Sequence, residues 1–304
     1  MKVAIRIGLF LTASAVWPQD LVVFHDSAET PQAQLIRYLN AIGKRQLAAR
    51  ADEIAGLKTR ADAERRQQAV HEKLLRLIGG LPAVHGPLHT RAAGVLKHDD
   101  YRIEKVIYES LPGFYVTANV YVPAHGAGPF PAVLMPVGHY ETGKDGERLV
   151  AVGLARKGFI ALEYDPVGQG ERIQYYDTDT GASKVGGSTT EHSHANGQTL
   201  LIGETVARYR IWDGIRGIDY LVSRKDVDAQ RIGCMGCSGG GTLTTYISVL
   251  DSRVKVAVPA CYITSWLALL DGPGPQDGEQ VFPRFLSEGL DRPISWSCSR
   301  RSRG

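Results

Sequence analysis

The hydrophobic pattern divides the chain into a helical first part and a longer part in which strands and helices alternate. In residues 30–79 apolar side chains recur near helical spacing, which predicts two helices that end at Gly79-Gly80. Residues 101–109 roughly alternate apolar and polar positions, and residues 114–122 follow after a Pro-Gly turn. We therefore expect an antiparallel pair of strands there.

Continuous apolar segments mark the strands of the later part. They predict buried strands over residues 131–137, 158–164, 231–235 and 254–259. Helical patterns lie between or beside them, over residues 147–157, 205–224 and 239–250. Alternating helices and apolar strands are typical of an α/β fold with a parallel sheet, preceded here by a linker at residues 82–87.

The strongest chemical signal is the run Gly236-Cys237-Ser238-Gly239-Gly240. It has the form G-x-S-x-G, with a predicted strand before it and a predicted helix after it, which is the context of a nucleophile elbow. Such a turn exposes the serine hydroxyl above the sheet and aims the next N–H at a developing oxyanion. We predict Ser238 as nucleophile and Gly239 as an oxyanion donor, over the alternative of a glycine-rich turn with an incidental serine.

Three other segments are candidates for the same site. The loop after residues 131–137 offers the N–H of Tyr140 as a second oxyanion donor, and we expect the adjacent His139 to orient this loop. Residues 165–172 form a tight turn that shapes the pocket wall. His192 and His194 lie in a polar, glycine-rich stretch, residues 186–197, where Glu191 is the one obvious acidic neighbour. We predict no metal and no cofactor.

The general base that Ser238 needs is missing from its expected place. In this design the chain order is serine, acid, histidine, yet the last histidine of the sequence is His194. Aspartates follow Ser238, but none is followed by a histidine: Asp251, Asp271, Asp277 and Asp291. We therefore expect neither the triad acid nor the triad histidine in this chain, and poor esterase activity from residues 1–304.

Residues 208–221 and 227–233, together with the elbow, resemble the acetyl xylan esterase and cephalosporin-C deacetylase-like group of α/β-hydrolases. The turn Gly168-Gln169-Gly170 matches that group too, and the resemblance covers about residues 101–291. It implies an α/β-hydrolase fold with helices on both sheet faces. It also implies a serine carboxylester hydrolase that deacetylates carbohydrate or similar small esters through an acyl-enzyme.

Two alternatives stay open. The run from Val227 to Gly240 is shared with prolyl-oligopeptidase-type peptidases, which would make the substrate a peptide; those enzymes carry a β-propeller that has no counterpart here. A non-catalytic α/β-hydrolase-fold protein is the other alternative. Acetyl ester and prolyl peptide assays separate the first two functions, and failure to trap an acyl-enzyme would favour the third.

The end of the chain departs from the family pattern. The resemblance implies about eight strands, whereas six are predicted, and residues 292–304 have no apolar period. Codons compatible with this tail, read one frame over, encode a plausible helix end, and the single codon of Trp296 restricts that reading. We infer a frameshift near residue 292. The predicted organisation is a signal peptide (1–17), a helical extension (30–80), an incomplete α/β-hydrolase domain lacking its last two strands (88–291) and an aberrant tail (292–304).

Composition narrows the compartment and the partners. Residues 1–17 have a basic start, a short apolar core and the small residues Ala13-Ser14-Ala15, which is typical of a secretory signal. We therefore predict export to the periplasm or the outside. The apolar core is too short to span a membrane, so we expect no stable membrane insertion. The net charge of +3 is accounted for by Arg300, Arg301 and Arg303 in the tail, so nucleic acid is not an expected partner. Of four cysteines, Cys237 and Cys261 follow adjacent predicted strands, and we expect them to lie close enough for a disulfide.

Overall fold

The computed structural model describes residues 31–83, 86–275 and 277–297. The chain divides into two compact units, Met1–Ala41 and Ile42–Gly304. The predicted signal peptide and residues 298–304 of the predicted tail lie outside the described residues. Among the described residues no helix has both the length and the apolarity needed to cross a membrane.

The first two helices confirm the helical part of the pattern. They are α1 (Pro31–Ala55) and α2 (Arg60–Leu77). Thr59 caps α2 in a reciprocal box with Asp62, which satisfies two of the N–H groups that the first turn leaves unpaired. Within the second unit, Val70 and Leu74 of α2 are buried in the main hydrophobic core.

Seven strands form one mixed sheet in the order β1-β2-β3-β5-β4-β8-β9. Their bounds are β1 (Arg91–Lys97), β2 (Tyr101–Leu111), β3 (Phe114–Pro123), β4 (Phe130–Pro136), β5 (Ile160–Tyr164), β8 (Val227–Cys237) and β9 (Val254–Ala260). The pairs β1–β2, β2–β3 and β3–β5 are antiparallel. The pairs β5–β4, β4–β8 and β8–β9 are parallel. A separate two-stranded ribbon joins β6 (Tyr176–Asp177) to β7 (Ala182–Ser183).

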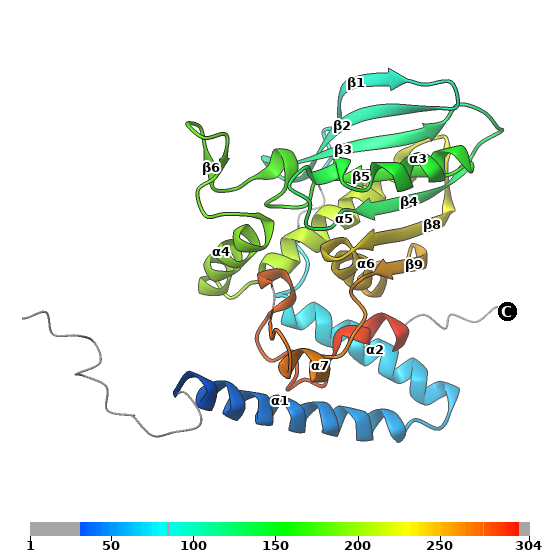
Figure 1. Ribbon diagram of the computed structural model, residues 1–304. Coiled ribbons are helices and arrows are strands. Elements are labelled where there is room, and N and C mark those ends of the chain that lie inside the picture. The colour runs from blue at the N-terminus through cyan, green and yellow to red at the C-terminus, as the bar shows by residue number, and fades with distance from the viewer. Residues whose placement is uncertain (1–30, 84–85, 276, 298–304) are drawn as a thin grey trace, which may run out of the picture. The chain divides into compact units, whose positions relative to one another are not determined.

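Helices cover both faces of this sheet, as Figure 1 shows. α3 (Arg148–Arg156) packs on one face, and α5 (Val206–Ser223) and α6 (Gly239–Leu250) pack on the other. Two further helices, α4 (Ser188–Leu201) and α7 (Trp266–Leu270), lie outside these layers (Figure 1). Single 3₁₀ turns are η2 (Gly143–Asp145), η3 (Gly170–Arg172) and η4 (Gly278–Gln280), and η5 (Arg292–Ser297) is a longer 3₁₀ segment that is kinked at Pro293. Side chains of β4 alternate between the faces: Leu134 belongs to the core under α5 and α6, whereas Met135 packs with the apolar side of α3.

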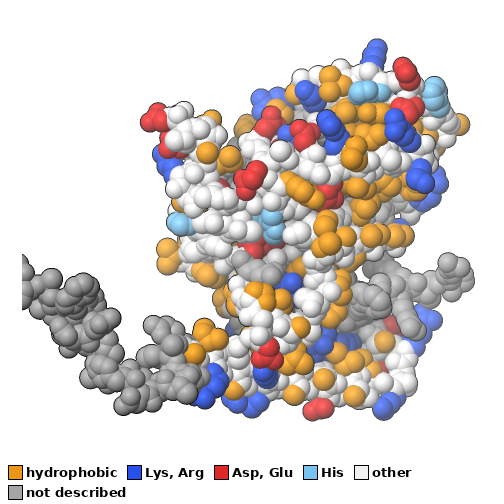
Figure 2. Space-filling view, in the orientation of Figure 1, with side chains coloured by type: hydrophobic (Ala, Val, Ile, Leu, Met, Phe, Trp, Pro, Cys, Tyr) orange, Lys and Arg blue, Asp and Glu red, His pale blue; other side chains and the backbone are white. Residues whose placement is uncertain are grey.

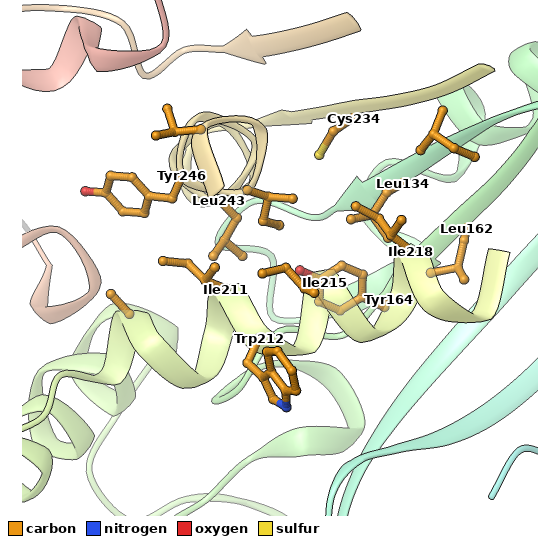
Figure 3. Close-up of a cluster of buried hydrophobic side chains, with 14 of the residues drawn as sticks. Leu134, Leu162, Tyr164, Ile211, Trp212, Ile215, Ile218, Cys234, Leu243 and Tyr246 are labelled. Carbon is orange, nitrogen blue, oxygen red and sulfur yellow. The ribbon is translucent and has the colours of Figure 1, made fainter. Parts of the chain in front are cut away.

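Helix α5 supplies much of the main core (Figure 3). Its Ile211, Ile215 and Ile218 recur at helical spacing, and they are buried with Leu134 of β4 and Leu243 of α6. Thr205 accepts a hydrogen bond from Arg208 N and so caps the helix at the predicted boundary. This packing fixes α5 and α6 against the strands whose ends carry the predicted site.

The structure departs from the sequence pattern in two places. The strand β1 was not predicted, because all its residues are exposed and its short, mixed sequence shows no apolar alternation. No helix was predicted in the glycine-rich stretch at residues 186–197, but residues 188–201 form α4. Tertiary contacts decide this helix, because His192 and Asn196 are buried on one of its faces although the segment carries few apolar residues.

The strand β9 lies at the end of the sheet order and pairs with β8. Val256 and Val258 on β9 are 63% and 49% exposed. Figure 2 shows hydrophobic side chains on the surface over β8 and β9. An exposed apolar edge strand favours pairing with another chain, so we expect β9 to promote self-association.

Replacing Trp212 with alanine is expected to lower the free energy of unfolding by about 3–5 kcal/mol. The indole is 1% exposed and donates from Nε1 to the Ser110 carbonyl at 2.8 Å, so its loss leaves both a cavity and an unpaired acceptor. Urea denaturation followed by circular dichroism measures the change. Leu149→Ala, on the exposed side of α3, is the control and should shift stability by no more than about 0.5 kcal/mol; equal losses would contradict the assignment.

Candidate active site

The candidate site lies at the carboxyl end of β4, where the order in which the strands are added to the sheet changes side. The strand β4 has β5 on one side and β8 on the other, so the connections leaving β4 and β8 diverge at their carboxyl ends. In open α/β sheets ligands bind in the crevice at such a switch point. The loop that follows β4 carries His139 and Tyr140, and the turn that follows β8 carries Ser238.

Ser238 occupies the predicted strand–turn–helix context. It joins β8 to α6 with φ 56° and ψ −117°, a conformation that is strained for a residue with a side chain. A Cβ atom at Gly236 or Gly240 would lie 2.2 or 2.1 Å from the Pro136 carbonyl oxygen. Only glycine fits at these two positions, because the turn passes directly against the end of β4.

His139 contacts Ser238 although it precedes the serine in the chain. Its Nδ1 lies 3.2 Å from Ser238 Oγ, and its Nε2 lies 2.8 Å from Asp277 Oδ2 and 3.1 Å from Glu279 Oε1. The ring packs on Gly239, where a Cβ would come within 2.6 Å of His139 Nε2. The structure thus brings one imidazole and two carboxylates to the serine. The imidazole precedes Ser238 in the chain and the two carboxylates follow it, which differs from the expected order of serine, acid and histidine.

The electrostatics of this group favour the charged imidazole. Burial disfavours a charge on His139, but its hydrogen bonds to Asp277 and Glu279 outweigh that effect and raise the pKa to about 9. Burial tends to raise the pKa of Asp277, yet the hydrogen bonds from the two histidines lower it below its usual value. At neutral pH His139 therefore carries a proton on both ring nitrogens, and Nδ1 donates to Ser238 Oγ.

A second layer of residues surrounds the two carboxylates. His192 Nδ1 lies 2.9 Å from Asp277 Oδ2, and Arg210 Nη2 lies 2.8 Å from Glu279 Oε2. Burial and the neighbouring Arg210 lower the pKa of His192, so it remains neutral. The charges of His139 and Arg210 then balance those of the two carboxylates, which allows four ionised groups to share a buried site.

The same cluster is the place where a metal could be held. Ligand atoms of His139, His192, Asp277 and Glu279 lie within 4.8 Å of one another, and imidazole with carboxylate is a donor set that suits zinc. Glu191, the acidic neighbour that the sequence pattern indicated, instead accepts the backbone N–H groups of residues 174 and 175. The sequence pattern did not indicate Asp277 and Glu279 as ligands, because they lie 85 or more positions after His192. The available signal was the pair of acids that flanks Gly278.

Hydrogen bonds from buried side chains fix the loop that carries His139. Gln169 Nε2 donates to the Gly138 carbonyl, and Glu147 Oε1 accepts from Gly138 N at 3.1 Å and from Cys237 N at 3.2 Å. The predicted turn at residues 168–170 thus positions the loop. One buried carboxylate ties this loop to the end of β8, which fixes the distance between His139 and Ser238.

The two predicted oxyanion donors differ in availability. Gly239 N is the first N–H of α6, a position without an intrahelical carbonyl partner. Tyr140 N donates to the Gly138 carbonyl at 2.7 Å, so it would have to leave that carbonyl before it could bind an oxyanion. The oxyanion roles of both residues remain predictions.

A cavity of about 240 Å³ opens onto Ser238 and His139. Its walls are mostly polar and come from α4, the segment after β9 and the region of η4 and η5: Thr189, Cys261, Tyr262, Asp277, Gln280 and Arg292. A space of this size accommodates an acyl group and part of a small alcohol, and is smaller than typical pockets for drug-sized ligands.

Comparison with known proteins shows the family of this chain. The family model for acetyl xylan esterase (AXE1) matches residues 94–266, more than half of the chain. The protein YtaP of Bacillus subtilis (strain 168), named as a hydrolase, is 28% identical over 208 residues, which cover 66% of this chain and 64% of YtaP.

Solved structures share the fold. The methylesterase BT1017 superposes with a TM-score of 0.64 at 26% identity, over 86% of this chain and 54% of that protein. A Bacteroides fragilis NCTC 9343 protein described as an acetyl xylan esterase gives a TM-score of 0.64 at 17% identity, over 79% of this chain and 66% of its own. The chain spans between half and two thirds of the length of these relatives.

The fold is that of an α/β-hydrolase, a class of enzymes whose esterase members include these structural neighbours. Within that class, the chain belongs to the acetyl xylan esterase family.

Proposed function

We propose that this chain is a serine carboxylester hydrolase that removes acetyl or similarly small acyl groups from carbohydrate or other small alcohols, with Ser238 as the nucleophile. The observation that carries the proposal is the geometry at the elbow. A strained Ser238 lies 3.2 Å from an imidazole nitrogen at the mouth of a cavity of about 240 Å³. Membership of the acetyl xylan esterase family supports the ester as substrate.

The residues present supply the steps of acyl transfer. Ser238 Oγ attacks the acyl carbon, and its proton passes to the neutral form of His139 at Nδ1. Asp277 and Glu279 accept from Nε2 and stabilise the imidazolium that forms. The Gly239 N–H is placed to stabilise the oxyanion. The same proton then goes to the leaving alcohol, and water hydrolyses the acyl-enzyme with His139 as base.

We further propose that activity is weak at neutral pH. With a pKa of about 9, only about 1% of His139 is neutral at pH 7 and able to take the serine proton. Poor esterase activity was expected because no histidine follows Ser238. In this proposal His139 takes that place, and its raised pKa is a different reason to expect weak activity at neutral pH. The carboxylate pair that orients His139 also holds it in the protonated state.

The test of function is substrate preference. Purified protein at pH 9 should hydrolyse p-nitrophenyl acetate with a kcat/KM at least about tenfold above that for the octanoate ester, because the cavity is small. A proline p-nitroanilide of a short peptide should not be cleaved. Cleavage of the anilide with no ester hydrolysis would replace the proposal with a peptidase.

A further inference from the structure

Two thiols lie at the carboxyl edge of the sheet, beside the nucleophile. Cys237 is the last residue of β8 and precedes Ser238, and Cys261 follows the last residue of β9. The two strands are parallel, with Cys237 paired to Ala260. Ser238 N also donates to the Ala260 carbonyl at 3.0 Å, so the two strand ends are joined directly at the elbow.

The backbone turns at Cys261, one residue beyond the partner of Cys237 in the strand register. In a regular strand the residue after Ala260 would point to the opposite face from Cys237. Cys261 has φ 55°, which turns the chain out of the strand, and the neighbouring Cys261 thiol is the first cause of the rise in the pKa of Cys237 to about 11. A residue one step beyond its partner on an adjacent strand has its Cα about 6 Å away, within the range that a disulfide spans.

This pair differs from the neighbouring Cys234 in access. Cys234 is buried, its Sγ contacts Thr244 Oγ1 at 3.6 Å, and burial raises the pKa of its thiol to about 12. Cys237 is half-buried and Cys261 is exposed, and both are free thiols. Cys261 also lines the cavity that contains Ser238, so a small reagent that enters the cavity meets it first.

We propose that Cys237 and Cys261 form a redox-modification site, in which a low-molecular-weight dialkyl disulfide converts them into an intramolecular disulfide. The Cys261 thiolate attacks one sulfur of the reagent and releases the first small thiol. Cys237 then attacks the resulting mixed disulfide at Cys261 Sγ and releases the second. The two protein thiols lose two electrons and two protons, and the reagent is reduced to two thiols.

The cross-link joins β8 and β9 at the point where the nucleophile emerges. It adds a covalent bond between the two strand ends and closes the chain around α6, the helix that follows Ser238. The site does not depend on esterase activity, since it rests on the strand register and the two sulfurs alone.

Peptide mapping of the full chain tests this proposal. Reduced protein is treated with hydroxyethyl disulfide at pH 8, the remaining thiols are alkylated, and the digest is analysed by mass spectrometry. We expect a peptide pair joined through Cys237 and Cys261, lighter by two hydrogens than the reduced peptides and separated again by dithiothreitol. Recovery of both residues as alkylated thiols, or a link to another cysteine, would overturn the proposal.

Two variants sharpen the result. In Cys261→Ser the link should be lost and Cys237 should carry a mixed disulfide with mercaptoethanol, whereas Cys298→Ser should retain the Cys237–Cys261 link in full. A link in the first variant, or its loss in the second, would assign the chemistry to a different pair. If a variant fails to fold, the map of the unmodified sequence still decides the question.

Discussion

Replacing Ser238 with alanine is expected to lower p-nitrophenyl acetate hydrolysis at pH 9.5 by about 10³-fold or more, because the attacking hydroxyl is removed while the oxyanion donor and cavity remain. The same change should abolish covalent labelling by a fluorophosphonate, which reports the nucleophile directly. Initial rates are measured after subtraction of the uncatalysed rate, and labelling is measured as the mass of the intact chain.

The control is Ser287→Ala, an exposed serine in the segment before η5. It should leave both the rate and the labelling unchanged. Labelling that persists in Ser238→Ala, or equal rates in the two variants, would place the reacting group elsewhere and would leave the fold without its proposed chemistry.

The pH dependence of the reaction is expected to be unusually alkaline. Neutral His139 is the base, and its pKa is raised to about 9, so the active fraction grows as pH rises toward that value. We expect kcat/KM to increase about tenfold for each pH unit from pH 6 to about 8 and to level off above pH 9. Across that range the gain approaches about three orders of magnitude, after the Ser238→Ala rate at each pH is subtracted.

A variant at the carboxylate locates the cause of the shift. Asp277→Asn removes a hydrogen bond that raises the pKa of His139, so the profile should move to lower pH while the limiting rate falls. Asp228→Asn, at the other end of β8 from Ser238, should leave the profile unchanged. A wild-type profile that is flat from pH 6 to 9, or one that persists in His139→Gln, would exclude His139 as the base.

Local patterns were sufficient for most of the fold. The apolar runs predicted β4 and β5, which are largely buried on both faces and are therefore apolar at nearly every position. The runs also predicted β8 and β9, although Val256 and Val258 of β9 are exposed. Gly236 and Gly240 marked the elbow and the start of α6 in the sequence. The structure gives the reason, because their close contact with Pro136 leaves no room for a side chain. By contrast, β1 is an exposed edge strand and α4 is held by buried polar residues, so neither carries an apolar period.

The sequence by itself determined the nucleophile candidate, because a G-x-S-x-G turn is a local object whose glycines, strand and helix are contiguous. Only the tertiary structure decided what surrounds Ser238. His139 lies 99 positions before it, and Asp277 and Glu279 come from a 3₁₀ turn that sequence alone did not connect to the site. The pKa of His139 likewise depends on burial and on two carboxylates from that distant turn, and such long-range electrostatics leave no mark in the spacing of residues.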